Sequence, residues 1–115
     1  MPERAPRKLD REVRDRVTPE LRAEVLRRDG CCVRSLFDDR HVCRDRFGVP
    51  HAPYALHLLT LDHVHGGYGL MGVRAPSDLA HLVATCWAAN VTEPPSHEFR
   101  QFERRYLAEK NAVLA

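Results

Sequence analysis

The chain has 115 residues, of which 43% are hydrophobic, 7% are aromatic and 30% are charged, with a formal net charge of +2. That length predicts one domain, because two separate cores of half this size would bury too little surface to outweigh chain entropy. The apolar fraction excludes a disordered chain, and no stretch comes near the roughly 18 apolar residues that a membrane-spanning helix needs.

Charge is distributed unevenly along the chain. Residues 1–46 hold thirteen Arg or Lys, whereas residues 47–95 hold one. Residues 1–17 are mostly charged and predict a solvated N-terminal arm, and residues 18–115 predict the domain itself. The start of the chain lacks the apolar run of a secretory signal, so we expect a cytoplasmic protein with no membrane partner.

The first predicted element is a helix over residues 18–29. Thr18 is a hydroxyl N-cap, and Pro19 is favoured in the first turn. Gly30 then suits the C-terminal stop, because glycine adopts the left-handed conformation there without strain.

Next come an irregular region and two predicted strands. Residues 31–55 contain mixed charges and two prolines. An irregular loop of that length ordinarily has a function or is held by a cross-link, for which Cys32 and Cys43 are the candidates. Apolar runs predict strands at 56–64 and 81–85. The glycine-rich segment 66–72 between them reads as a connector, because no Gly-Lys-Ser/Thr follows it as in a phosphate-binding loop.

The last part of the chain predicts two helices. One begins at 86–90, and the other is capped by Ser96 after a Pro-Pro pair. The second helix carries an apolar stripe near the 3.6-residue period, which is typical of a docking face. Its members are Phe99, Phe102, Tyr106 and Leu107.

The chain holds four cysteines, namely Cys31, Cys32, Cys43 and Cys86. Nothing in the sequence indicates secretion, and thiols stay reduced in the cytosol. Metal ligation or simple burial therefore explains these thiols better than disulfides do.

Asp62 and His63 lie side by side at the end of the first predicted strand. An aspartate carboxylate is a hard oxygen ligand suited to Mg²⁺, and a histidine near its ordinary pKa can take a proton from water. Asn90, on the following helix, can offer a side-chain oxygen to the same ion. This set suits metal-assisted phosphodiester hydrolysis. A buried histidine bonded to its neighbour is the alternative reading of the dipeptide.

The ordered series of motifs resembles the HNH endonuclease family, in particular the small HNH proteins of actinobacteria and their phages. The resemblance covers about residues 21–107. It is carried by the segments Val25–Gly30, Cys43–Gly48, Leu58–Val64 and Arg74–Cys86.

The resemblance implies an α+β fold with a ββα-metal core, in which a hairpin and one crossing helix hold a divalent ion, with further helices flanking it. By position, His63 would be the general base. Asp62 and Asn90 would be ligands of Mg²⁺ or Mn²⁺. His81 stands where the family usually has an asparagine that pins the hairpin loop, and a neutral imidazole offers fewer hydrogen bonds than an amide.

Many HNH domains also carry a structural zinc on two pairs of cysteines. Three cysteines match this pattern: Cys32, Cys43 and Cys86. Ala89 stands where the fourth would be expected, so the fourth ligand is Cys31, His41 or missing. Three buried thiols without a metal are the alternative, since a structural zinc site ordinarily has four protein ligands.

These observations predict a divalent-metal-dependent DNA endonuclease. The alternatives are a non-catalytic, zinc-stapled nucleic-acid-binding module and an accessory subunit of a phage DNA-packaging complex. Arg27 and Arg28 are candidate phosphate contacts, although positive charge at the end of a helix is favoured in any case.

Overall fold

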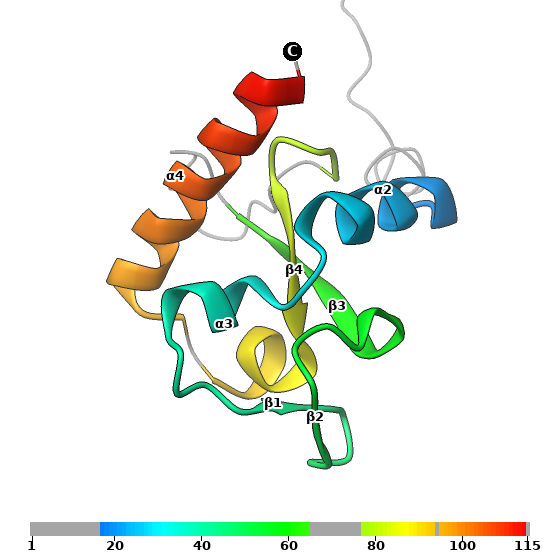
Figure 1. Ribbon diagram of the computed structural model, residues 1–115, viewed down its shortest axis with the longest axis vertical. Coiled ribbons are helices and arrows are strands. Elements are labelled where there is room, and N and C mark those ends of the chain that lie inside the picture. The colour runs from blue at the N-terminus through cyan, green and yellow to red at the C-terminus, as the bar shows by residue number, and fades with distance from the viewer. Residues whose placement is uncertain (1–16, 65–76, 94, 115) are drawn as a thin grey trace, which may run out of the picture.

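The computed structural model describes residues 17–64, 77–93 and 95–114. Within them the chain forms three α-helices, two short irregular helices and two two-stranded antiparallel sheets (Figure 1). The fold class is therefore mixed helix and antiparallel strand, as expected. The predicted arm (apart from residue 17) and the predicted glycine-rich connector lie outside the described residues.

Helix α2, Pro19–Asp29, matches the predicted helix in both bounds and caps. The Thr18 hydroxyl accepts a hydrogen bond from the Leu21 N–H at 3.1 Å. Gly30 adopts a φ of 68°, and its N–H donates to the Leu26 carbonyl at 2.8 Å. Both ends of the helix thus find partners for backbone groups that would otherwise be unpaired.

The segment predicted to be irregular contains more structure than expected. Helix α3, Val33–Phe37, is followed by strands β1, Cys43–Arg44, and β2, Pro50–His51, which pair antiparallel. The turn between these strands is closed by Asp45, whose carboxylate accepts from two backbone N–H groups. Elements of two to five residues carry too little periodicity for the sequence to reveal them.

The second sheet is the centre of the fold. Strands β3, Leu59–His63, and β4, Leu82–Cys86, pair antiparallel with Asp62 opposite Val83. The predicted first strand begins instead with a single 3₁₀ turn, η1, Leu56–Leu58. After β4 comes a short π-helical segment, η2, Ala88–Thr92, in place of the ordinary helix that was expected.

Helix α4, His97–Leu114, confirms the last predicted helix. The Ser96 hydroxyl accepts from the Phe99 N–H at 3.1 Å, as an N-cap does. No helix in the described part of the chain is long and apolar enough to cross a membrane.

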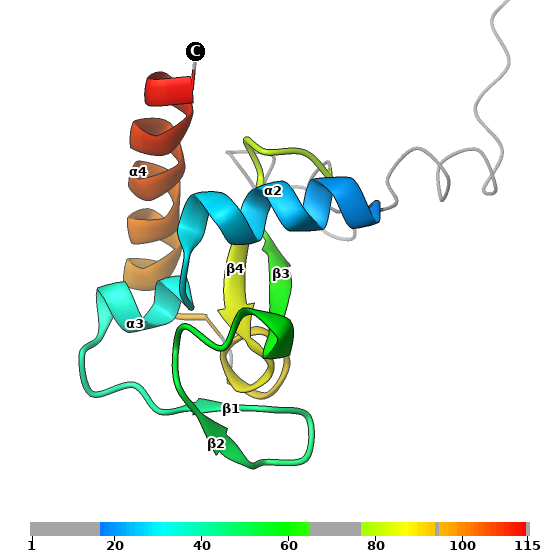
Figure 2. The same cartoon turned by 45° about the vertical axis from the view of Figure 1, so that its right-hand side comes forward.

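Both faces of the β3–β4 hairpin are covered, and all five residues of β4 are buried. Leu82, Ala84 and Cys86 belong to one apolar cluster with Val25 of α2. Val83 belongs to a second cluster, with residues of α3 and α4 that include Phe99. Figures 1 and 2 show the hairpin between α2 and α4. Because neighbouring residues of a strand point to opposite faces, the hairpin supplies side chains to two cores.

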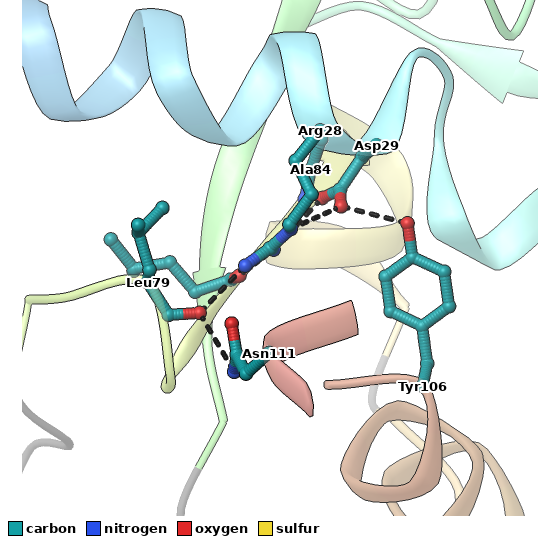
Figure 3. A network of polar contacts seen from close by, with 7 residues as sticks. Arg28, Asp29, Leu79, Ala84, Tyr106 and Asn111 are labelled. Atoms are coloured by element: carbon teal, nitrogen blue, oxygen red, sulfur yellow. Dashed lines mark hydrogen bonds and ion pairs between the residues drawn. The ribbon is translucent and has the colours of Figure 1, made fainter. Parts of the chain in front are cut away.

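A buried polar network joins these layers (Figure 3). The Asp29 carboxylate, at the end of α2, accepts from the Ala84 N–H at 2.8 Å and from the Tyr106 hydroxyl at 2.7 Å. It also pairs with Arg28, whose guanidinium donates to the backbone carbonyls of Leu79 and Leu82. Burial, together with the Asp29 carboxylate, raises the pKa of Tyr106. The network ties the end of α2 to β4 and α4.

Candidate metal centre and hairpin site

Four side chains from distant parts of the sequence converge beside the central hairpin. They are Cys32, His41, Cys43 and Cys86, and their ligand atoms all lie within 4.8 Å of one another. Cys32 is the N-cap residue of α3, Cys43 begins β1 and Cys86 ends β4. This group could hold a metal ion such as zinc, for which three thiolates and one imidazole form a common tetrahedral set.

His41 is the member that the sequence left open. Its Nε2 lies 3.2 Å from the Cys86 Sγ, so this nitrogen faces the thiols. Its Nδ1 faces the other way, 3.9 Å from a Glu93 carboxylate oxygen, within ion-pair range but too long for a hydrogen bond. Cys31 is not in the group. The His-x-Cys spacing of His41 and Cys43 was the available signal.

The surroundings of the thiols favour thiolate at Cys86, whereas the hydrogen bond to Cys86 together with burial raises the pKa of Cys32. The Cys32 thiol hydrogen-bonds to Cys86 and lowers the pKa of the Cys86 thiol, and the Ala89 N–H and the His41 ring act in the same direction. The Cys86 N–H in turn donates to the Cys32 Sγ at 3.2 Å. Burial raises the pKa of Cys43, although the Ser35 hydroxyl lies 3.5 Å from its sulfur. Thiolate is the form that binds a metal.

Asp62 lies under α4 and is almost fully buried, with 5% of the residue exposed. The Arg100 Nη1 donates to its Oδ2 at 2.7 Å. The same nitrogen donates to the Glu103 Oε1 at 2.9 Å. One cation therefore faces two carboxylates from different elements.

Asn90 contacts the same strand as Asp62. Its amide nitrogen donates to the Thr60 hydroxyl at 2.8 Å and to the Leu61 carbonyl at 3.2 Å. Thr60 and Asp62 are two residues apart on β3, so their side chains share a face of the sheet. Because the nitrogen makes both contacts, the carbonyl oxygen is the atom that remains to bind a cation.

The two histidines of the predicted site have other neighbours. The His63 Nε2 lies 3.0 Å from the Ser77 hydroxyl. As the residue after Asp62 on β3, His63 leaves the strand toward the opposite face. The His81 Nδ1 lies 2.7 Å from an Asp78 carboxylate oxygen, and its backbone carbonyl accepts from the Val64 N–H. His81 thus contacts Val64 and Asp78 at the loop end of the β3–β4 hairpin.

Glu103 was not identified from the sequence. It is fully buried on α4, and burial together with the Asp62 carboxylate raises its pKa to about 9, which outweighs the opposite effect of Arg100. The available signal was its place within the apolar stripe of α4, between Phe102 and Tyr106, where a charged residue is out of pattern.

The two candidate phosphate-binding arginines differ in their surroundings. Arg27 is exposed, whereas the guanidinium of Arg28 is engaged in the network of Figure 3. No protein-family model, curated protein or solved structure matches the chain. Inference about function therefore starts from the sequence motifs and from the two clusters of side chains described above.

Proposed function

We propose that the protein is a divalent-metal-dependent DNA endonuclease of the HNH type whose fold is stabilised by a structural zinc ion. The observation that carries the proposal is the order β3, β4, η2, with Asp62 and Asn90 on one face of β3. A hairpin followed by a short helix that returns to the first strand is the arrangement that the ββα-metal resemblance implies.

Asp62 and Asn90 would hold Mg²⁺ or Mn²⁺. Both offer oxygen atoms, which is the donor type that these cations prefer, and Mg²⁺ commonly keeps only one or two protein ligands beside water and phosphate. When bound, the ion stabilises the negative charge that develops on the phosphate and on the leaving oxygen. Asp62 would have to exchange its partner Arg100 for the cation, which leaves that guanidinium available to a DNA phosphate.

His63 would take the proton from the attacking water. Its side chain leaves β3 toward the face opposite Asp62, so the proposal requires that the end of β3 turns when DNA binds. His63 is the last residue of that strand, where such a rotation breaks little pairing. A general base can lie away from its target before DNA binds, because catalytic contacts often form only in the substrate complex.

The zinc would be structural. Cys32, His41, Cys43 and Cys86 provide a complete set of four ligands, so no position remains open for substrate. The Glu93 carboxylate lies 3.9 Å from the outer nitrogen of His41, and a shorter contact on zinc binding would let it orient the imidazole. The ion would fasten α3 and β1 to the end of β4, directly before η2 and Asn90.

Two observations favour the second candidate, a non-catalytic nucleic-acid-binding module held together by zinc. Asp62 is already paired with Arg100, and His63 points away from it. A module of this kind would bind DNA through its arginines and leave it intact, whether alone or as an accessory subunit of a phage packaging complex.

The two candidates are separated by measuring DNA binding and DNA cleavage on the same preparation. Zinc-loaded protein is incubated with supercoiled plasmid and Mg²⁺ or Mn²⁺, and binding is followed by gel shift. The nuclease predicts nicked product that Asp62→Asn abolishes while binding persists. Asp39→Asn, at an exposed position, is the matched control and should nick normally. Binding without nicking, under every divalent ion tried, would favour the module.

A further inference from the structure

Glu103 is buried, whereas a glutamate on a helix is ordinarily exposed to solvent. Its side chain is fully buried on α4, a helix that supplies apolar side chains to the second cluster. Its Oε1 accepts from Arg100, but its Oε2 is buried and has no hydrogen-bond partner among the described residues. A buried polar atom without a partner is destabilising, so such atoms are rare and call for an explanation.

The position of Arg100 indicates what the partner is. Its Nη1 lies 2.7 Å from the Asp62 Oδ2 and 2.9 Å from the Glu103 Oε1, so a single positive group sits between the two carboxylates. The two carboxylate side chains are 7% and 0% exposed, whereas Arg100 is 26% exposed. The cation is thus the member of the group that can move toward solvent, and the carboxylates are held in place.

We propose that Glu103 is a second carboxylate ligand of the divalent cation bound by Asp62. The Arg100 guanidinium occupies the position between the two carboxylates until the cation binds there. The inference rests on the proposed function and adds a ligand from α4 to it. A divalent ion in place of the guanidinium would be neutralised by the two carboxylates together, once Glu103 is ionised. The ion would also give a partner to the Glu103 Oε2 atom, which has none among the described residues.

The test measures Mn²⁺ binding to zinc-loaded protein from the electron paramagnetic resonance signal of free Mn²⁺, without DNA. We expect one site in the wild type, a loss of binding in Asp62→Asn, and a Kd raised about tenfold or more in Glu103→Gln, since even outer-sphere partners of a metal commonly contribute that much. Arg100→Gln should bind Mn²⁺ more tightly than the wild type, because it removes the competing cation. Glu109→Gln, exposed on the same helix, should change nothing.

The opposite effects of Glu103→Gln and Arg100→Gln separate a ligand from a residue that only supports the fold. Wild-type affinity in a folded Glu103→Gln, while Asp62→Asn binds no Mn²⁺, would overturn the role of Glu103 and leave the proposed function standing. No Mn²⁺ binding by the wild type would instead remove the cation site itself. Should Glu103→Gln fail to fold, Arg100→Gln decides: tighter binding supports the proposal, and equal or weaker binding contradicts it.

Discussion

At the scale of single residues, His63 carries the chemical step of the proposed reaction. Because it would remove a proton from water, His63→Ala should lower the rate of plasmid nicking by about 10²–10⁴-fold, the usual contribution of a general base. DNA affinity and melting temperature should stay close to wild type, since the side chain is half-buried and belongs to neither apolar cluster. A variant that melts early and nicks at the wild-type rate would show that His63 is structural.

Glu103 predicts a dependence of stability on pH. Its pKa is raised from 4.5 to about 9 in the folded chain, so the folded state binds the proton more tightly than the unfolded state. The stabilisation is complete below about pH 4.5 and is lost as pH rises toward 9, with a slope of at most about 1.4 kcal/mol per pH unit. Urea unfolding at several pH values, without added divalent cation, measures this slope.

Glu103→Gln is the variant that tests the assignment of the slope. Glutamine keeps the shape and cannot ionise, so the decline between pH 4.5 and 9 should become shallower. Glu98→Gln, at an exposed position of α4, should leave the slope as it is. A decline that is equally steep in Glu103→Gln would mean that another group is responsible.

At the scale of elements, the four-ligand cluster predicts how the parts of the domain are held together. The protein should contain one zinc per chain, and a chelator should lower its melting temperature, because folding and metal binding are coupled in small zinc domains. His41→Ala should weaken zinc retention, whereas His41→Cys should preserve it, since cysteine supplies an equivalent ligand. Metal content by mass spectrometry and thermal unfolding check both. Unchanged zinc content in His41→Ala would exclude this histidine as a ligand.

The contact between α2 and α4 is open to a separate test. Tyr106→Phe removes the hydroxyl that donates to the buried Asp29 carboxylate at 2.7 Å. Hydrogen bonds to charged groups contribute about 1.5–3 kcal/mol, and the free energy of unfolding should fall by that amount. Tyr54→Phe is the control, since Tyr54 is 72% exposed. Equal stability of the two variants would mean that the network of Figure 3 is not a structural tie.

At the scale of the whole molecule, the elements that could be predicted are those with caps or long periodicity. Helix α2 has Thr18 and Gly30 at its ends, and α4 has Ser96 and an apolar stripe. Strands β1 and β2 pair over two residues each, so their alternation is too short to detect. The π-helical form of η2 also leaves no periodic signal in five residues.

The candidate site also contains residues that the sequence predicted and contacts that it did not. Three thiol ligands followed from the cysteines, but the choice of His41 over Cys31 depends on how β1 is folded back onto β4, which is a tertiary contact. Asp62 could be singled out from the sequence because it precedes His63 at the end of a predicted strand. The contact of Asp62 with Arg100 and Glu103 spans about forty residues of sequence, and no local pattern encodes a contact of that kind.

In the proposed function, the fold binds a divalent ion at Asp62 and Asn90 and uses it to cut DNA. This function is tested by the rate of plasmid nicking by zinc-loaded protein as a function of Mg²⁺ concentration, in the wild type and in Asn90→Ala. We predict nicking that saturates with Mg²⁺ in the wild type and needs a higher Mg²⁺ concentration in Asn90→Ala, because one oxygen ligand has been removed. Wild-type protein that folds, retains zinc and produces no nicks at any Mg²⁺ concentration would show that the protein is not a nuclease of this kind.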